Sequence, residues 1–192
     1  MKRTILATMA ALLMSTAAQA ENDITLYSSK DSQWSVSQMA RNSNGDAMCT
    51  MQTLFAKGAI WLKMSAHGSL QFHVGKGTWS FVKGNKRVPL TVSFDDREDW
   101  PAKAEILGKD LLYLTLTPEQ MPRFLDQVRT SDKMVVHFPK GNEPDWIAGM
   151  KGSRKAVEVF WKCASDIGAL DALNAQPGEE DDEKPAADKR GA

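Results

Sequence analysis

Three histidines, His67, His73 and His137, are the side chains of this chain best suited to acid–base or metal chemistry. Each falls at a polar position of a segment in which apolar and polar residues alternate. If these segments were neighbouring strands, the three imidazoles would meet in one catalytic or metal site. No Gly-x-Ser-x-Gly nucleophile motif accompanies them. The sequence therefore favours three separate, solvated histidines on the surface.

Two loops carry chemical groups without a matching motif. The first is a charged loop over 95–101, whose carboxylates are Asp95, Asp96, Glu98 and Asp99. It lacks the alternating ligands and central glycine of a calcium loop, so we expect it to be solvated. The second, Gly75-Lys76-Gly77-Thr78, lacks the Gly-x-x-x-x-Gly-Lys frame of a phosphate-binding loop and precedes a strand. The sequence therefore predicts no catalytic residue, no cofactor and no metal ligand.

Tryptophan is frequent, with six residues, and exposed tryptophans can form a stacking platform for sugars. Trp79 and Trp161 occupy the apolar phase of their segments, which predicts burial. Trp61, Trp100 and Trp146 are the remaining candidates for sugar binding. Single exposed apolar side chains are ordinary in folded proteins, so a binding role is not the default expectation.

The chain begins with a predicted secretory signal over 1–20. Two basic residues precede an apolar run over 5–14 and the small-x-small site Ala18-Gln19-Ala20, after which cleavage is expected. The mature chain would hold a β-rich globular domain over 21–175 and a disordered acidic tail over 176–192. Its 24 − 2 = 22 basic residues balance 24 acidic ones, so nothing indicates nucleic-acid binding. We expect a periplasmic or secreted protein with no membrane span in the mature chain.

The two cysteines, Cys49 and Cys163, are predicted to form a disulfide. Export places them in an oxidising compartment, where a bond is favoured over two buried thiols. Both lie at apolar positions of their segments. The bond would close a loop of roughly 115 residues, which corresponds to about 4–5 kcal/mol in the chain-entropy description.

The elements that position these residues are mostly short strands. Alternating residues separated by Gly or Asn turns are typical of an antiparallel meander with one wet and one dry face. Such segments are 23–29, 33–39, 47–55, 60–66, 70–74, 79–81, 88–94, 111–116, 133–139 and a last strand within 142–150. With two helices near the C-terminus, the pattern predicts a mainly β fold: an antiparallel β-sandwich or flattened barrel whose helices cover one open end.

A terminal amphipathic helix is predicted over 153–167. Its apolar arc comprises Ala156, Val157, Val159, Phe160, Trp161, Cys163, Ala164 and Ile167. Ser153 is predicted as the N-cap and Gly168 as a left-handed stop. A shorter helix over 121–129 follows a capping-box sequence at 117–120, and Pro122 is expected to distort its start.

Several short motifs resemble those of the invasion-associated locus B family of exported bacterial proteins. They are Trp34-Ser-Val36, Cys49-Thr-Met-Gln52, and Met150-Lys-Gly-Ser153 leading into the terminal helix. Members often carry a cysteine soon after the tryptophan and a further pair mid-chain, whereas Ser37 and Gln38 stand near the first position here. The resemblance spans most of the mature domain. It implies a periplasmic or surface β-rich protein associated with host-cell invasion or colonisation, and it carries over no catalytic residue.

The predicted function is that of an exported, non-enzymatic β-domain that binds a protein partner in the cell envelope or in a host. A small periplasmic hydrolase that uses the histidines or the acidic loop is the alternative from the enzyme class. A third possibility is an inhibitor that presents an exposed loop to a host cell-wall-degrading enzyme. A concave pocket in which one of the histidines meets a carboxylate would favour the hydrolase.

Overall fold

The computed structural model describes residues 23–39, 46–55, 58–81, 87–140 and 142–175. Within these ranges, ten antiparallel strands form one sheet in the order β1-β2-β3-β4-β5-β8-β7-β6-β9-β10. The strands are β1 (Asp23–Tyr27), β2 (Trp34–Met39), β3 (Met48–Phe55), β4 (Gly58–Ser65), β5 (Leu70–Gly75), β6 (Val88–Phe94), β7 (Trp100–Leu107), β8 (Leu111–Leu116), β9 (Lys133–His137) and β10 (Trp146–Gly149). The helices are α1 (Gln120–Thr130), α2 (Ser153–Asp166) and α3 (Ala169–Asn174).

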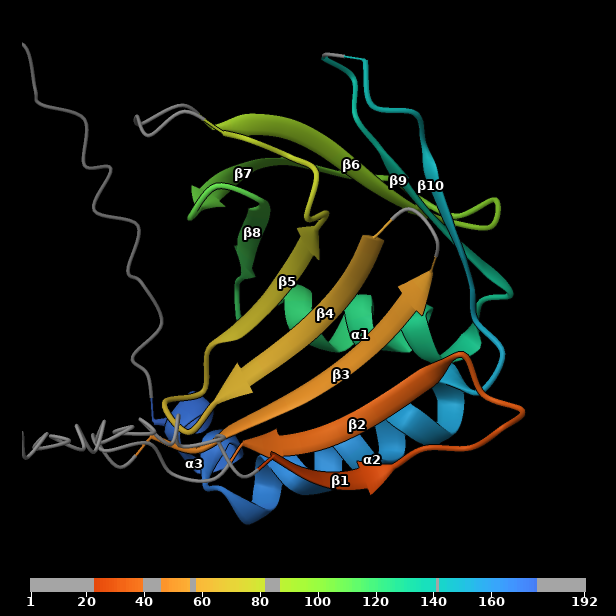
Figure 1. Ribbon diagram of the computed structural model, residues 1–192. Coiled ribbons are helices and arrows are strands. Elements are labelled where there is room, and N and C mark those ends of the chain that lie inside the picture. The colour runs from red at the N-terminus through yellow and green to blue at the C-terminus, as the bar shows by residue number, and fades with distance from the viewer. Residues whose placement is uncertain (1–22, 40–45, 56–57, 82–86, 141, 176–192) are drawn as a thin grey trace, which may run out of the picture.

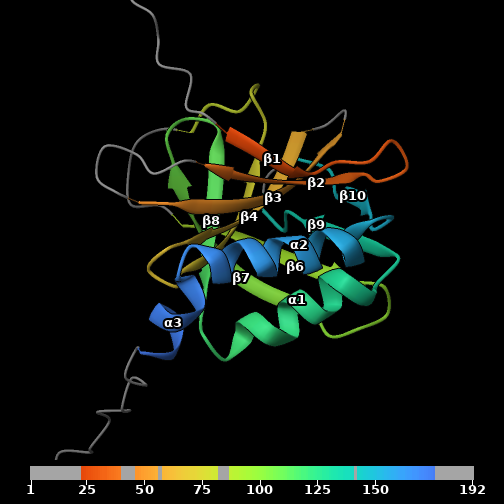
Figure 2. The same ribbon diagram turned by 90° about the horizontal axis from the view of Figure 1, so that it is seen from below.

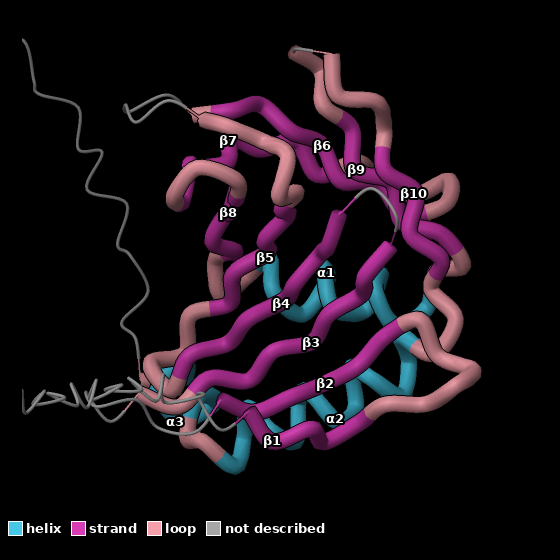
Figure 3. The backbone as a smooth tube through the Cα atoms, in the orientation of Figure 1, coloured by secondary structure: helices cyan, strands magenta, loops and turns pink. Residues whose placement is uncertain are grey.

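The sheet is strongly curved. Strands β1 to β5 form a broad layer, and β6, β9 and β10 lie across from it after the turn made at β8 and β7 (Figure 1; Figure 3). The end of β10 returns to the start of β2, where the Gln33 N–H donates to the Lys151 carbonyl at 3.1 Å. The Trp34 Nε1–H also donates to the Gly149 carbonyl, at 3.1 Å. The predicted mainly β fold, an antiparallel sandwich or flattened barrel, is thus confirmed, with all ten described strands in one open, curved sheet.

Helices α1 and α2 lie side by side against the inner face of the sheet (Figure 2). Helix α2 packs on β2 and β3. Phe124 of α1 meets Phe72 and Phe94 edge to face, with ring centroids 5.7 and 5.3 Å apart. Phe124 therefore joins the two opposing parts of the curved sheet, and the core lies between sheet and helices.

Strand β4 shows how the alternation predicted from the sequence builds this core. Ile60, Leu62 and Met64 are almost fully buried, whereas the residues between them are half-buried on the outer face. Burying one such side chain stabilises a fold by roughly 1.5–3 kcal/mol relative to leaving it in water. A register slip of one residue would exchange the two faces, so the pattern fixes the register of the ladder.

The predicted disulfide between Cys49 and Cys163 is present. It joins β3 to α2 with a Cα–Cα distance of 6.0 Å, and both residues are buried. The bond attaches the last part of helix α2 to the start of strand β3.

Two strand predictions were wrong. Strand β7 was not expected, because its inward positions include Ala102 and Ala104, and alanine, lysine and glutamate are depleted in strands. Residues 79–81 were expected to form a strand, but they are irregular. The Trp79 N–H donates to the Lys76 carbonyl at 2.8 Å, and the Phe81 N–H donates to the Lys109 carbonyl at 2.7 Å.

The helix ends also differ in part from expectation. The N-cap of α2 is Gly152 rather than Ser153, with a φ of 88° that favours glycine, and a Cβ there would strike Ser32. Gly168 does adopt the predicted left-handed conformation, with φ 80°. Pro122 lies in the first turn of α1, where backbone N–H groups need no helical partner, so it distorts nothing.

The prediction that Trp161 belongs to the buried face of α2 was wrong. Trp161 retains 37% of its surface exposed, while its neighbour Phe160 is fully buried.

The predicted signal over 1–20 and the predicted tail over 176–192 lie outside the described residues. In the part of the chain that the structure describes, no helix combines the length and apolar character that crossing a bilayer requires.

Candidate functional site: a cleft between β7 and β8

The sheet opens between β7 and β8. These strands pair only at Glu105–Leu107 with Leu111–Tyr113. Beyond that point β7 continues along β6, and β8 continues along β5. The facing edges of 100–104 and 114–116 are therefore not joined to each other in the ladder, and a cleft forms between them.

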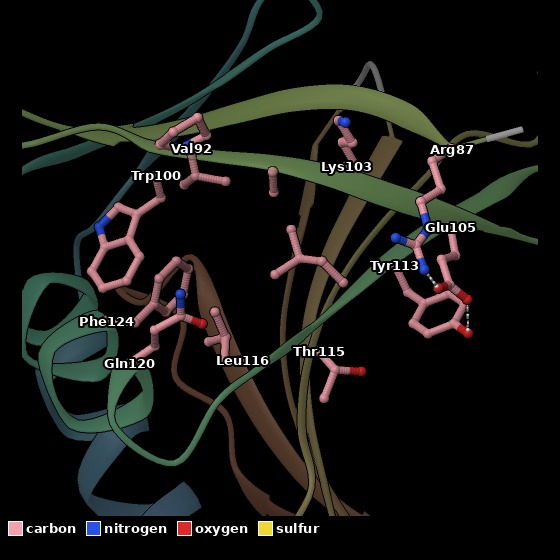
Figure 4. A pocket seen from close by; sticks show the side chains of 13 residues that line it. Arg87, Val92, Trp100, Lys103, Glu105, Tyr113, Thr115, Leu116, Gln120 and Phe124 are labelled. Carbon is pink, nitrogen blue, oxygen red and sulfur yellow. Dashed lines mark hydrogen bonds and ion pairs between the residues drawn. The ribbon is translucent and has the colours of Figure 1, made fainter. Parts of the chain in front are cut away.

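The cleft has a volume of about 320 Å³, and its lining combines buried apolar side chains with exposed polar ones. It is lined by Arg87, Val92, Trp100, Pro101, Ala102, Lys103, Glu105, Tyr113, Leu114, Thr115, Leu116, Gln120 and Phe124. Figure 4 shows Trp100 and Phe124 at one end and the Tyr113–Glu105–Arg87 group at the other. The volume is at the lower end of the range for ligand sites, about 300–1,000 Å³.

Trp100 forms a fixed wall at the helical end of the cleft. Its Nε1–H donates to Gln127 Oε1 of α1 at 2.6 Å. Its ring meets Phe124 edge to face with centroids 5.2 Å apart, and the Arg123 guanidinium lies 4.7 Å from its centroid. These contacts hold the indole from three directions, so this end of the cleft is formed before any ligand arrives.

Glu105 organises the opposite, polar end. Its carboxylate accepts from Arg87 Nη2 at 3.1 Å and from the Tyr113 hydroxyl at 2.7 Å. The hydrogen bond to Glu105, then burial and the negative charge of Glu105, raise the pKa of Tyr113 above its ordinary value of 10.0. The phenol is therefore a neutral donor at physiological pH, already used by Glu105.

His73 lies next to this end, under Tyr113, and is buried rather than solvated as predicted. The two rings stack with centroids 5.6 Å apart. Burial, and to a lesser degree the charge of Lys63, lower the pKa of His73 from 6.5 to about 4. Its Nε2 pairs with Gln71 Oε1 at 2.9 Å, and Nδ1 has no hydrogen-bond partner among the described residues. His73 is thus a neutral packing residue.

The other two histidines are each placed beside a carboxylate. His67 Nε2 lies 3.0 Å from Asp46 Oδ1, at an exposed turn. His137 Nδ1 lies 2.8 Å from Asp145 Oδ2, and its Nε2 lies 2.7 Å from the Ser93 hydroxyl. The three histidines do not share one site. Neither Ser93 nor Asp145 was named from the sequence, because no local motif links them to His137.

The predicted charged loop has a structural role at its first residue. Asp95 has a φ of 47°, and its carboxylate accepts from the N–H groups of Asp132 and Lys133 at 3.0 and 2.9 Å. Glu98 pairs with Arg123 of α1 at 2.6 Å. Across the described ranges, no group of three or more His, Cys, Asp or Glu side chains is arranged to hold a metal ion.

The three tryptophans predicted as candidates for sugar binding lie in three different environments. Trp146 is fully buried and stacks on Trp79 with centroids 5.1 Å apart, so it cannot meet a sugar from solvent. Trp61 is half-buried and donates from Nε1 to Gln52 Oε1 at 2.9 Å. Trp100 lines the cleft. Of the three candidates, only Trp100 lies in the described cleft.

Glu143 accepts hydrogen bonds from an aromatic cluster in which Phe138 and Trp146 are buried and Phe55, Trp79 and Phe81 are half-buried. Its carboxylate accepts from Trp79 Nε1 at 3.0 Å, Trp146 Nε1 at 2.8 Å and Lys76 Nζ at 3.0 and 3.1 Å. Burial alone would raise the pKa of Glu143, but these three donors together hold it below 4.5. Each carboxylate oxygen accepts from two donors, so Glu143 ties the two indoles to Lys76 and stabilises the fold.

Comparisons of the chain with protein-family models, with curated proteins and with solved structures gave no match. The cleft must therefore be interpreted from its own geometry. It combines an apolar floor, a fixed aromatic wall and two strand edges that face each other. Such an arrangement suits the binding of an extended segment.

Proposed function

We propose that this protein is an exported binding domain that takes an extended segment of a protein partner into the cleft between β7 and β8. The observation that carries the proposal is the opening of the β7–β8 ladder above an apolar floor. Unpaired strand edges bind extended peptides through main-chain hydrogen bonds, and side-chain pockets supply the specificity. Here the floor would receive one apolar side chain of the segment, between Trp100 and Leu116.

The charges at the rim favour a segment of mixed polarity. Lys103 is exposed at the upper edge in Figure 4, while Arg87 and Glu105 neutralise each other at the polar end. An acidic residue beside the apolar anchor would meet Lys103 without disturbing the Arg87–Glu105 pair. Pairs of this kind contribute little affinity but fix the register of the bound segment.

Two further observations support export and partner binding. A disulfide is typical of oxidising compartments, and the first 20 residues have the order of a secretory signal. The motifs at Trp34, Cys49 and Met150 resemble those of the invasion-associated locus B family. On that resemblance, the partner would belong to the cell envelope or to a host surface, in a process of invasion or colonisation.

Site-directed photocrosslinking tests the proposal. A photoreactive residue at Thr115, an exposed position that lines the cleft, should capture a partner in intact cells. The same residue at Glu158, exposed on α2, is the matched control. Ala102→Trp fills the cleft from β7 and should abolish the Thr115 adduct while leaving the circular dichroism spectrum unchanged. Equal adducts from both positions, or an adduct that survives Ala102→Trp, would contradict the proposal.

A further inference from the structure

A hydrogen-bonded chain of Ser93, His137 and Asp145 lies on the outer face of β6, β9 and β10. These strands are adjacent in the sheet and run together in Figure 1. The Ser93 Oγ to His137 Nε2 distance is 2.7 Å, and the His137 Nδ1 to Asp145 Oδ2 distance is 2.8 Å. The first distance is within the range required of a nucleophile and its base, and the second within that of a base and its orienting group.

The register of the ladder places these groups in two adjacent rows. Thr91 is opposite His137, and the same register continued one residue before β10 places Asp145 opposite His137. In the next row, Ser93 is opposite Val135, which is opposite Ile147. Directly paired residues of an antiparallel ladder project from the same face. Ser93 therefore has a base diagonal to it, Val135 beside it, and Ile147 one strand further along the same row.

The proton positions follow from the partners. An ionised carboxylate can only accept, so Asp145 directs the ring proton of a neutral His137 to Nδ1. Nε2 is then the acceptor that faces Ser93, and the serine hydroxyl donates to it. This is the protonation pattern by which a histidine removes a proton from an attacking serine.

Exposure and anchoring also fit a reactive site. The side chains of His137 and Asp145 are 39% and 52% exposed, whereas Ser93 is only 8% exposed, so solvent reaches the base and its carboxylate while the serine lies below them. The Asp95 carboxylate binds the N–H groups of Asp132 and Lys133 at the start of β9. It thereby fixes the β6–β9 register on which the Ser93–His137 contact depends.

We propose that Ser93, His137 and Asp145 form a site that hydrolyses carboxylic esters with an aliphatic acyl chain. Ser93 Oγ bonds to the acyl carbon while its proton moves to His137 Nε2. The ester C–O bond then breaks, and the leaving alcohol takes that proton. Water, deprotonated by His137, releases the carboxylic acid and restores Ser93. Asp145 acts as a positioning residue, since it holds the imidazole in the required tautomer.

The acyl chain is assigned to the row formed by Ser93, Val135 and Ile147. Two strand spacings separate the ends of this row, about 10 Å. Ile147 is 64% exposed, although it is a large apolar residue. It also lines a second cavity of about 350 Å³ that includes Leu54, which is 67% exposed. An aliphatic chain from Ser93 would cover Val135 and Ile147 and end beside this cavity.

Labelling with an alkyl fluorophosphonate tests the nucleophile directly. The reaction forms a Ser–O–P bond and expels fluoride, with the serine proton transferred to His137. We expect peptide mapping to find the label at Ser93 of the full-length oxidised protein. Ser37, an outer-face residue of β2 flanked in register by Thr25 and Thr50, is the internal control. Labelling of Ser93 no faster than that of Ser37 would overturn the proposal.

Hydrolysis of p-nitrophenyl acetate and butyrate tests the roles of the neighbours. Ser93→Ala should abolish turnover, and His137→Gln should lower kcat by at least about 100-fold. Asp145→Asn, at a half-exposed side chain, should lower kcat with little change in KM, while circular dichroism reports the fold. Ile147→Ala should raise KM for butyrate several-fold more than for acetate. Unchanged turnover in either Ser93→Ala or folded Asp145→Asn would exclude this site.

Discussion

Removing the Cys49–Cys163 bond should destabilise the protein strongly without abolishing its fold. The bond closes a sequence separation of 114 residues. In the chain-entropy description, a loop of this length loses about 16 cal/mol/K in the unfolded state, or about 5 kcal/mol at 25 °C. Whole domains are stable by only about 5–15 kcal/mol, so the loss is a large fraction of the total.

Several contacts remain when the bond is absent. Helix α2 still buries Ala156, Phe160 and Ala164 against the sheet. We therefore expect Cys163→Ala to fold and to lose about 3–5 kcal/mol, which is near the usual cost of removing such a bond. Alanine is preferred to serine because position 163 is buried and a hydroxyl there would need a partner.

Urea unfolding followed by circular dichroism measures the loss. With a slope of about 2 kcal/mol/M, the midpoint should fall by about 2 M. Cys49→Ala and the double variant are the controls, because all three proteins lack the same single bond and should be equally stable. A loss below about 1 kcal/mol in Cys163→Ala, or a double variant that loses the sum of the two single changes, would refute the reasoning.

Three further predictions concern His73, Glu143 and the two neighbouring aromatic residues of α2. His73 has its pKa lowered from 6.5 to about 4, so the unfolded chain binds a proton that the folded chain excludes; the free energy of unfolding should fall by about 3 kcal/mol as pH drops from 6.5 to 4. His73→Phe should remove that part of the decrease in urea titrations. Glu143→Gln should cost about 1–3 kcal/mol, because Lys76 loses its countercharge and one of the two indole N–H groups loses its acceptor oxygen; an unchanged midpoint would contradict the role given to Glu143. Phe160→Ala should cost about 3–5 kcal/mol and Trp161→Ala much less, since only Phe160 is fully buried; equal losses would contradict the assigned helix face.

The alternating strands could be predicted because each depends on local sequence. Leu62 and Met64 alternate with polar residues, and that pattern alone indicates which face is dry. Strand β7 was not predicted from the sequence, because its inward alanines are small and alanine is depleted in strands. The disulfide was predictable from elimination, since only two cysteines exist.

The cleft and the Ser93–His137–Asp145 chain could not be predicted, because both depend on long-range strand order. Ser93 and His137 are separated by 44 positions and meet only because β6 pairs with β9. Likewise, the cleft exists because β8 leaves β7 to follow β5. Nothing local in either segment specifies its neighbour. His73 was misplaced for the same reason, since it is covered by Tyr113 from β8.

Hydrogen exchange with a bound partner segment tests the central claim most directly. The segment captured from Thr115 would be synthesised as a peptide and added to the full-length oxidised protein. Strand addition predicts slower exchange of amides within 100–104 and 114–116, where new main-chain hydrogen bonds would form. The amides of β2 and β3 should be unchanged. Protection that is absent from both cleft edges, or that appears only elsewhere on the protein, would contradict binding between β7 and β8.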